Sequence, residues 1–418
     1  MSQTIAEKIL ARCAGRLQVK PGEFIWANVD QTDADPNHLK LLDQLGVKKL
    51  ANPEMVWTTS DHYAPATDVH YANQDNLLRK YVRQYGIRHF FEYGRHGILH
   101  QLFGENGAIL PGTLSAMSDS HSTSGGVFNA FATPIGIEVV FVLATGRLWF
   151  QVPETIRFDL IGELPEYCYG KDVVLSILRD HGSGVCIYRV LEFGGRGLNG
   201  LSIASRWTLS NMGVELGAKA AICEYDDRLR DYLAQMTTRA YNSVAPDPDC
   251  TYALRHTVDL TQLEPLVACP HDPSNVHPAA EVEGWNVKVN QVFLGSCTNG
   301  RLEDLEIAAE LLKGRRVHPD VRMIVSPASQ AVWKEALAKG YLEILADAGA
   351  LVSHSTCGPC FGGHLGVLGD GDVCMSSSNR NFKGRMGSAE SFVYLGSPAT
   401  AAAAAIAGKI IDPRNLSV

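Results

Sequence analysis

The sequence predicts an α/β protein of two or three domains. Strand-like apolar runs alternate with helical patterns nearly throughout the chain, which is typical of α/β folds. The 418 residues exceed what one ordinary hydrophobic core accommodates. Apolar residues make up 45% of the chain and charged residues 20%, so the composition is that of a globular rather than a disordered protein.

The elements are clearest in the C-terminal third. Strands are expected at residues 289–294, 322–325, 350–353 and 373–375, and helices at residues 302–312 and 330–348. The last helix has a strong start signal, because Ser397 can cap it and Pro398 suits its first position. After an alanine run we expect this helix to end near Gly408.

Charge and cysteine content exclude several classes of function. The formal net charge of −8 gives no general basic surface, so we expect no nucleic-acid partner. Ten cysteines scattered over a long chain are unlike a secreted disulfide framework, which predicts a reducing compartment, the cytoplasm. The N-terminus lacks the apolar run of a signal peptide, and no run of about 18 apolar residues predicts a membrane span.

Polar loops follow the four predicted strands of the C-terminal third. Cys297 follows the first strand, Ser326 the second, Cys357 and Cys360 the third, and Asn379 the fourth. In an open parallel sheet, ligands bind beyond the carboxyl ends of the strands. We therefore expect these loops to meet on one edge, where the three cysteines can converge although 60 residues separate Cys297 from Cys357.

The cysteine spacing alone leaves several kinds of site open. The Cys-x-x-Cys at 357–360 is compatible with a structural zinc site, which Cys297 and either His354 or His364 would complete. It is equally compatible with two of the three ligands of an iron–sulfur cluster, and a redox pair is a lesser alternative. The glycines around this motif favour a backbone wrapped closely around a bulky group.

Charged and polar side chains elsewhere are candidates for binding and proton transfer. Arg380 and Arg385 fall beside the same sheet edge, and planar guanidinium groups suit carboxylates. Asn211 and Glu215 are four apart and would share a helix face. Acids and histidines that could orient an imidazole and move protons are Asp61, His62, His100, Asp119 and His121. Each of these residues is also compatible with a purely structural role.

One glycine-rich segment resembles a nucleotide-binding loop. Residues 195–200 match G-x-G-x-x-G after a strand-like run at 185–193, and Glu224 could be the acid that such a fold requires. The mid-chain position and the sequence from Trp207 argue against a phosphate-binding helix. A nicotinamide-dependent oxidoreductase is therefore a minor alternative.

Four motifs, in this order, carry a family resemblance: Gly295-Ser-Cys-Thr-Asn-Gly-Arg-Leu-Glu-Asp-Leu, Thr356-Cys-Gly-Pro-Cys-Phe-Gly-Gly-His-Leu-Gly, Ser378-Asn-Arg-Asn-Phe-Lys-Gly-Arg-Met-Gly and Ser397-Pro-Ala-Thr-Ala-Ala-Ala. With them the chain resembles the aconitase superfamily, and within it the large subunits of 3-isopropylmalate dehydratases. The resemblance runs from about residue 40 to the C-terminus.

The resemblance implies a [4Fe–4S] cluster held by Cys297, Cys357 and Cys360, with one iron facing a small hydroxy-acid substrate. Such enzymes eliminate water and, in the isomerases, return it at the neighbouring carbon. Arg380 and Arg385 would hold substrate carboxylates. The other implied site residues are Asp61, His62, His100, Asp119, His121 and Glu215 around the leaving hydroxyl, with Asn211 and Asn379 supporting the cluster and its ligands.

The family fold implies three α/β/α domains around a central iron–sulfur cleft, here residues 1–153, 154–283 and 284–418. The resemblance also implies that the fourth, swivelling domain of the family, which carries the catalytic serine base, is absent from this chain. A separate small subunit is therefore the expected partner, and the chain alone should be nearly inactive.

Two departures from the family pattern leave the hydroxy acid open. Val29-Asp-Gln-Thr-Asp33 stands where His-Asp-x-Thr-Thr-Pro is usual. Ser118-Asp-Ser-His-Ser-Thr stands where Gly-Asp-Ser-His-Thr-Cys is usual, although Asp119 and His121 are kept. The implied reaction interconverts 3-isopropylmalate and 2-isopropylmalate. Maleate or citraconate hydratase, dimethylmalate dehydratase and homoaconitase activities remain alternatives, as does a zinc-stabilised protein without catalysis.

Overall fold

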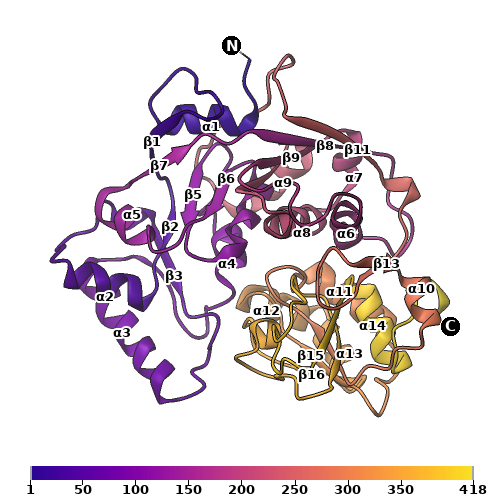
Figure 1. Cartoon of the computed structure of the whole chain (residues 1–418). Coiled ribbons are helices and arrows are strands. Elements are labelled where there is room, and N and C mark those ends of the chain that lie inside the picture. Colours follow the sequence, from indigo (N-terminus) through magenta and orange to yellow (C-terminus); the bar gives the residue numbers. More distant parts are fainter. Residues whose placement is uncertain (1, 417–418) are drawn as a thin grey trace.

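Five β-sheets form in residues 2–416, the part of the chain that the computed structural model describes. Figure 1 shows their elements in three groups. The N-terminal segments, in indigo and purple, lie on the left, and the middle segments lie at the upper right. The C-terminal segments, in orange and yellow, lie at the lower right.

The N-terminal group contains three small sheets. The three-stranded parallel sheet has the order β2 (Thr32–Asp33), β3 (Val56–Thr59), β4 (His89–Phe91). The parallel pair is β5 (Leu114–Met117) with β6 (Phe131–Pro134), and the antiparallel pair is β1 (Phe24–Asn28) with β7 (Arg147–Gln151). The helices are α1 (Ile5–Cys13), α2 (Pro36–Gln44), α3 (Val69–Tyr85), α4 (Leu99–Glu105) and α5 (Val139–Thr145), with the 3₁₀ helices η1 (Pro53–Met55) and η2 (Ser120–Phe128).

The middle group is built on one parallel sheet. Its order is β10 (Ala220–Cys223), β9 (Val190–Gly194), β8 (Thr155–Ile161), β11 (Leu254–Asp259). The helices are α6 (Gly170–His181), α7 (Arg196–Gly200), α8 (Ile203–Met212) and α9 (Asp227–Met236), with η3 (Gly213–Leu216) and η4 (Leu260–Gln262). Ser202 caps α8, since its hydroxyl accepts a hydrogen bond from the Ser205 amide at 3.1 Å.

The C-terminal group is built on a seven-stranded sheet. Its order is β13 (Val276–Pro278), β12 (Leu266–Ala268), β18 (Phe392–Leu395), β17 (Val373–Ser376), β14 (Gln291–Leu294), β15 (Arg322–Val325), β16 (Leu351–Val352). The strands from β18 to β16 in this order pair parallel, whereas β12 pairs antiparallel with both of its neighbours. The helices are α10 (Ala279–Gly284), α11 (Leu302–Leu312), α12 (Gln330–Ala338), α13 (Tyr341–Asp347) and α14 (Pro398–Ala407), with η5 (Gly358–Phe361) and η6 (Pro413–Asn415).

Most of the elements expected in this group are confirmed. The helix at 302–312 and the strand at 322–325 have the predicted bounds. The single helix expected over 330–348 is wrong, because α12 and α13 are separate helices. Gly340 lies between them with φ +79°, a left-handed conformation that interrupts a right-handed helix. The strands β12 and β13 precede residue 284 yet join this sheet, and the domain boundaries at 153 and 283 stay a prediction.

The alanine-rich helix α14 lies in the core of the C-terminal group. The Ser397 hydroxyl accepts a hydrogen bond from the Thr400 amide, and Gly408 ends the helix in the left-handed conformation, as predicted. Ala401, Ala402, Ala404 and Ala405 are fully buried and pack in one cluster with apolar residues of α11 and β14. Short side chains let the backbones approach closely, which suits a helix that is apolar on all sides.

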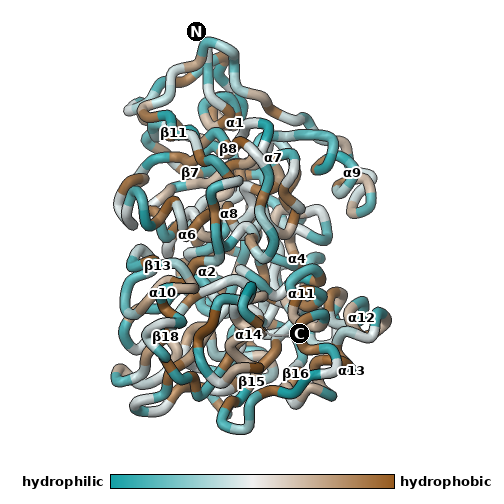
Figure 2. The backbone as a smooth tube through the Cα atoms, turned by 90° about the vertical axis from the view of Figure 1, so that its right-hand side faces the viewer, coloured by the Kyte–Doolittle hydropathy of each residue, from teal (hydrophilic) through white to brown (hydrophobic). Residues whose placement is uncertain are grey.

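Figure 2, turned by 90°, keeps α1 and β8 at one end of the molecule and β15 and β16 at the other. Among the described residues, no helix combines the length and the apolar character that crossing a membrane requires.

Candidate active site

Three of the four loops expected to meet at the carboxyl ends of the C-terminal sheet line one cavity, whereas Ser326, after β15, does not line it. The loops after β14, β16 and β17 carry the three cysteines and Asn379 to its wall. The cavity has a volume of about 110 Å³. Its lining residues are Asp61, His62, Ile98, His100, Asp119, Ser120, His121, Ser296, Cys297, Cys357, Cys360, Phe361, Asn379 and Arg385. Cys297 therefore lines one small space together with Cys357 and Cys360, although 60 residues separate it from Cys357.

The turn that carries Cys360 depends on a glycine. Gly362 ends η5 with φ +76°, and a Cβ atom there would lie 2.9 Å from the backbone nitrogen of Gly387. Any other residue would therefore be strained and would collide with the backbone of the neighbouring loop. This explains why a glycine follows the Cys-Gly-Pro-Cys-Phe segment.

The three cysteine sulfurs do not all lie within 4.8 Å of one another. All ten cysteines lie in the described residues and are free thiols. Among those residues, metal-ligand atoms within 4.8 Å of one another occur in the set Asp61, His62 and Cys357, which contains neither of the other two cysteines. Tetrahedral zinc would hold thiolates about 4 Å apart. Three thiols that line one cavity without forming such a compact set fit a group larger than a single ion, such as an iron–sulfur cluster.

The zinc alternative also lacks its histidine. The His354 Nε2 lies 2.6 Å from the Ala64 carbonyl oxygen, and the His364 Nδ1 lies 3.2 Å from the Thr356 hydroxyl. Neither histidine lines the cavity that the cysteines share. The structure therefore gives the predicted Cys3His zinc set no support.

Two asparagine side chains point at Cys297. The Asn211 Nδ2 donates to the Cys297 Sγ at 3.2 Å, and the Asn379 Nδ2 lies 3.4 Å from the same sulfur. The Cys360 Sγ donates to the Asn379 Oδ1 at 3.7 Å. Burial raises the pKa of the Cys297 thiol to about 12 and that of Cys357 well above its ordinary value. A metal would have to displace these protons, and the amides would then donate to a thiolate.

The predicted acids and histidines form one hydrogen-bonded network beside the cysteines. The Asp61 carboxylate lies 2.7 Å from the His62 Nδ1 and accepts from the Leu99 amide at 3.0 Å. The other side of the His62 ring faces Asp119, with 3.6 Å between Nε2 and Oδ2. Asp119 also contacts the His100 Nε2 at 2.9 Å. Residues of two loops and of the first turn of α4 are thereby connected to one another.

This network holds charges at fixed positions. Burial opposes the imidazolium form of His62, but the carboxylates of Asp61 and Asp119 outweigh it and raise its pKa to about 9. Burial likewise opposes the ionised Asp119, but the imidazoles around it hold its pKa well below the ordinary value. At neutral pH the site therefore presents an imidazolium between two carboxylates.

Arg385 lines the cavity, and Arg380 and Glu215 contact its lining residues Ser120 and His121. The Arg380 Nε donates to the Glu215 Oε1 at 2.8 Å, and its Nη1 donates to the Ser120 hydroxyl at 3.0 Å. The same Glu215 oxygen lies 3.0 Å from the His121 Nε2. The Arg385 Nε is buried and has no hydrogen-bond partner among the described residues. A cavity that contains an unpaired guanidinium donor suits a carboxylate ligand.

A second chamber of about 380 Å³ adjoins the cavity and shares Asp61, His62 and Asp119 with it. One residue of each departure from the family pattern, Asp33 and Ser118, lies in its wall, whereas Val29 does not. Asp33 accepts a hydrogen bond from the Ser118 amide at 2.8 Å and another from the Ser118 hydroxyl. Burial raises the pKa of Asp33. The two departures thus form one structural unit beside the site.

The glycine-rich segment at 195–200 packs against a strand. A Cβ atom at Gly195 would lie 2.5 Å from the Leu160 carbonyl oxygen, and one at Gly197 would lie 2.8 Å from the Leu160 carbonyl carbon. Glu224 pairs with Arg157, with 2.6 Å between nitrogen and oxygen. These glycines therefore let α7 approach β8, which accounts for the motif without a nucleotide.

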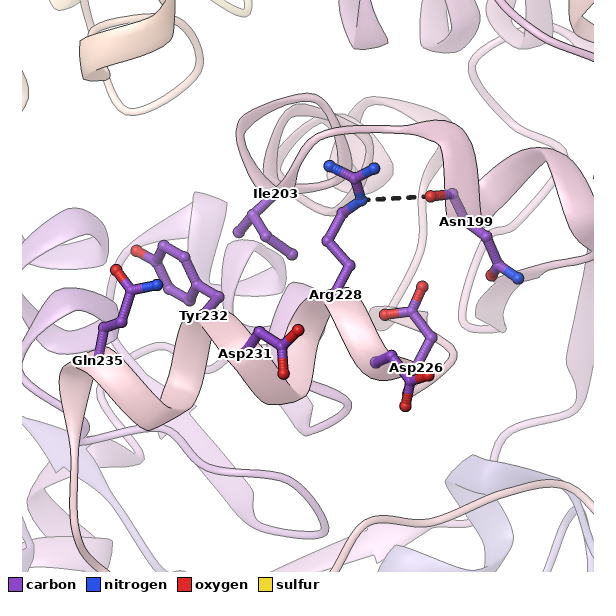
Figure 3. Close-up of a pocket in the computed structure, with 8 residues that line it drawn as sticks. Asn199, Ile203, Asp226, Arg228, Asp231, Tyr232 and Gln235 are labelled. Carbon is purple, nitrogen blue, oxygen red and sulfur yellow. Dashed lines mark hydrogen bonds between the residues drawn. The ribbon is translucent and has the colours of Figure 1, made fainter.

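A shallower hollow of about 820 Å³ lies beside α9 and is drawn in Figure 3. It contains none of the predicted site residues. The Arg228 Nε donates to the Asn199 carbonyl oxygen at 3.2 Å, which is the dashed line in Figure 3. Asp226 pairs with the buried Arg206 at 2.6 Å. These charges hold the segments together, so we do not place the chemistry here.

The model of the aconitase family (aconitate hydratase) matches residues 48–408 of this chain. The chain belongs to the aconitase family. The predicted fold class, an α/β protein of the aconitase type, is confirmed with it.

Relatives in this family match over nearly the whole chain. The 3-isopropylmalate dehydratase large subunit of Sulfurihydrogenibium sp. is 43% identical, with 100% of this chain and 97% of the relative covered. The 3-isopropylmalate dehydratase large subunit 1 of Methanopyrus kandleri is 44% identical, with 99% of each covered. The large subunit of Thermodesulfovibrio yellowstonii is 44% identical, with 100% of each covered. Among solved structures, aconitase X of Thermococcus kodakaraensis matches with a TM-score of 0.49 at 14% identity, covering 85% of this chain and 84% of that one.

The sequence interpretation missed residues whose hydrogen bonds hold the loops and side chains of the aconitase-type site in place. Arg301 is buried and donates to the Cys297 carbonyl oxygen at 2.6 Å. Ser120 binds Arg380, and Lys171 is fully buried against the loop before Asn379. Lys171 could have been noticed in the sequence, because it is a single lysine that stands just before the apolar run Val173–Leu175. The partner of that lysine, 207 residues away, could not be read from the sequence.

Proposed function

We propose that this chain is the large subunit of a [4Fe–4S]-dependent hydro-lyase that interconverts 3-isopropylmalate and 2-isopropylmalate. The observation that carries the proposal is the shared cavity. Three free thiols line it together with an unpaired arginine donor and an acid–histidine network. The relatives named 3-isopropylmalate dehydratase large subunit support the choice of substrate.

Cys297, Cys357 and Cys360 would hold the cluster. Their spread, their lack of disulfides and the amide donors to Cys297 fit this group better than zinc. When bound, such a cluster would supply an iron that lacks a protein ligand and acts as a Lewis acid on a hydroxyl. Free thiols throughout the chain also support our proposal of a cytoplasmic location.

Arg385 and Arg380 would bind the substrate carboxylates. The unpaired Nε of Arg385 can donate to one carboxylate without breaking an existing bond. Arg380 is already oriented by Glu215 and Ser120, which fixes its guanidinium before substrate arrives. Two oriented cations would also stabilise negative charge that develops when a carbon-bound proton leaves.

The imidazolium of His62 would give a proton to the departing hydroxyl. Asp61 orients its ring at Nδ1, and Asp119 keeps it charged. His100 can return a proton along the Asp119 carboxylate. His121, bound to Glu215, would connect this network to Arg380. We propose that the small subunit supplies the base that removes the carbon-bound proton.

The cluster is tested by substituting one of its ligands. Anaerobically purified wild type should contain about four irons and four sulfides per chain, with a broad visible absorption that bleaches in air. We expect Cys357→Ser to lose most of its iron and sulfide and all measurable activity. Cys250→Ser, a partly exposed cysteine far from the cavity, is the matched control and should retain the cluster. Zinc without sulfide in reconstituted wild type would refute the proposal.

The substrate is tested separately. With the small subunit present, 3-isopropylmalate should give the highest kcat/KM among 3-isopropylmalate, citraconate, maleate, 2,3-dimethylmalate and homoisocitrate. The unit formed by Asp33 and Ser118 is where this chain departs from the family pattern, so the comparison is informative. A higher value with another acid would keep the mechanism and change the substrate.

A further inference from the structure

Lys171 is a buried cation whose two hydrogen-bond partners are both uncharged. It is fully buried in the first turn of α6, and its Nζ donates to the Ser378 carbonyl oxygen at 2.6 Å and to the Met212 Sδ at 3.4 Å. Within residues 2–416 it forms no ion pair. A cation at a helix N-terminus also opposes the helix dipole. Its position is therefore unfavourable unless negative charge is supplied nearby.

The two partners of Lys171 adjoin the two amides that point at Cys297. Ser378 immediately precedes Asn379, and Met212 immediately follows Asn211. Both asparagines place an Nδ2 within 3.4 Å of the Cys297 Sγ. One ammonium group thus joins the loop after β17 to the end of α8, which are the segments that carry those donors.

Two carboxylates and two cysteines of the proposed site face Lys171. Asp304 acts on it most strongly, followed by Cys360, its neighbour Asp172 and Cys297. Asp172 is engaged by the amides of Tyr169 and Leu266, and Asp304 by Asn299 and the Arg301 amide. Burial lowers the pKa of Lys171 to about 7 while the thiols are neutral. Thiolate ligands would supply the missing negative charge.

We propose that Lys171 is a positioning residue for the cluster site, which holds both asparagine donors on Cys297 and supplies the positive charge that balances its thiolates. This inference rests on the proposed cluster. A positive charge behind the thiolates favours the reduced, more negative state of the cluster and keeps iron bound. Removing the charge should therefore lower the reduction potential and speed the loss of iron.

The test compares Lys171→Met with Lys171→Arg and wild type after anaerobic reconstitution. We expect Lys171→Met to have a lower midpoint potential in an electron paramagnetic resonance titration. It should also release iron to a chelator at least about tenfold faster. Lys171→Arg, which keeps the charge, should restore most of both properties. Lys219→Met is the matched control, because Lys219 is also largely buried and donates to a carbonyl oxygen, that of Pro134, but adjoins no cysteine loop.

Lys171→Gln can still donate to the Ser378 oxygen but has no charge, so it separates the hydrogen-bonding role of Lys171 from its electrostatic role. It also replaces Lys171→Met in the test if that variant does not fold. A wild-type potential and iron-release rate in the neutral variants would overturn this inference. Wild type that takes up no iron and sulfide would instead overturn the proposed function. The two failures are therefore distinguishable.

Discussion

Arg380 and Arg385 lie on one loop, yet their surroundings differ. Arg380 is bound to Glu215 and Ser120, so its guanidinium is held in place by the protein. The buried Nε of Arg385 has no such partner among the described residues, although it lies in the cavity wall. A buried donor without an acceptor costs free energy that a bound carboxylate would recover. We therefore assign carboxylate binding mainly to Arg385.

Arg385→Lys should lower kcat/KM at least about 100-fold, because a lysine cannot reproduce the planar donor geometry. We expect most of this decrease to come from a higher KM. The rate is measured from the ultraviolet absorbance of the enoic acid at varied substrate concentration. Arg189→Lys, which changes a surface arginine paired with Glu154, should stay within about twofold of wild type. An unchanged KM in Arg385→Lys would remove Arg385 from the substrate site.

At the scale of the element, one carboxylate fixes α1 to the sheet of the middle group. Glu192 lies in β9 and is fully buried. Its Oε1 accepts a hydrogen bond from the Ala6 amide at 3.0 Å, and its Oε2 accepts one from the Tyr252 hydroxyl at 3.0 Å. Burial raises the pKa of Glu192 to about 7. The packing of the first helix is therefore sensitive to pH.

Glu192→Gln should remove part of the pH dependence of stability. Between pH 4.5 and 7 the folded wild type keeps a proton that the unfolded chain has lost, so the free energy of unfolding falls as pH rises. Glutamine does not titrate, so the free energy of unfolding of the variant should rise relative to that of wild type by up to about 3 kcal/mol from pH 4.5 to 8. Urea unfolding at both pH values measures it.

Glu154→Gln, at an exposed glutamate, is the control for this measurement and should show no such growth. If the free energy of unfolding of Glu192→Gln differs from that of wild type by the same amount at pH 4.5 and pH 8, the raised pKa of Glu192 is contradicted. Such a result would mean that the folded and unfolded states hold the Glu192 proton equally well.

At the scale of the whole molecule, the cavity is lined by the N-terminal and C-terminal groups and supported by the middle group. Asp61 and His62 come from the N-terminal group and the cysteines from the C-terminal group, while Glu215 of the middle group contacts the lining residue His121. The His121–Glu215–Arg380 chain joins all three. The site can therefore form only when the groups are packed together.

The purified chain with its cluster should be nearly inactive alone, and adding the small subunit should raise turnover of 3-isopropylmalate at least about 100-fold. The reason is that our proposed mechanism leaves the base for the carbon-bound proton to the partner. Activity titrated against small-subunit concentration measures this, with the Cys357→Ser chain as a control that stays inactive. Full turnover by the chain alone would refute the division of the site between two subunits.

Local sequence signals determined much of the fold and part of the site. Ser397, Pro398 and Gly408 act within one helix, so their effect on its ends could be read directly. The convergence of the cysteine loops also followed from sequence, because parallel strands put all their carboxyl ends on one edge. The break at Gly340 was missed, because glycine is tolerated inside many helices and only the backbone φ reveals the interruption.

The sequence by itself determined which elements form, which residue types follow each strand, and hence the kind of chemistry to expect. The tertiary structure alone decided which side chains meet: Asn211 with Cys297, Lys171 with Ser378, and Arg380 with Glu215. Those pairs are separated by 86, 207 and 165 residues. Helix caps and strand periodicity arise from neighbours in the chain, whereas such contacts depend on how whole sheets pack, which no local pattern encodes.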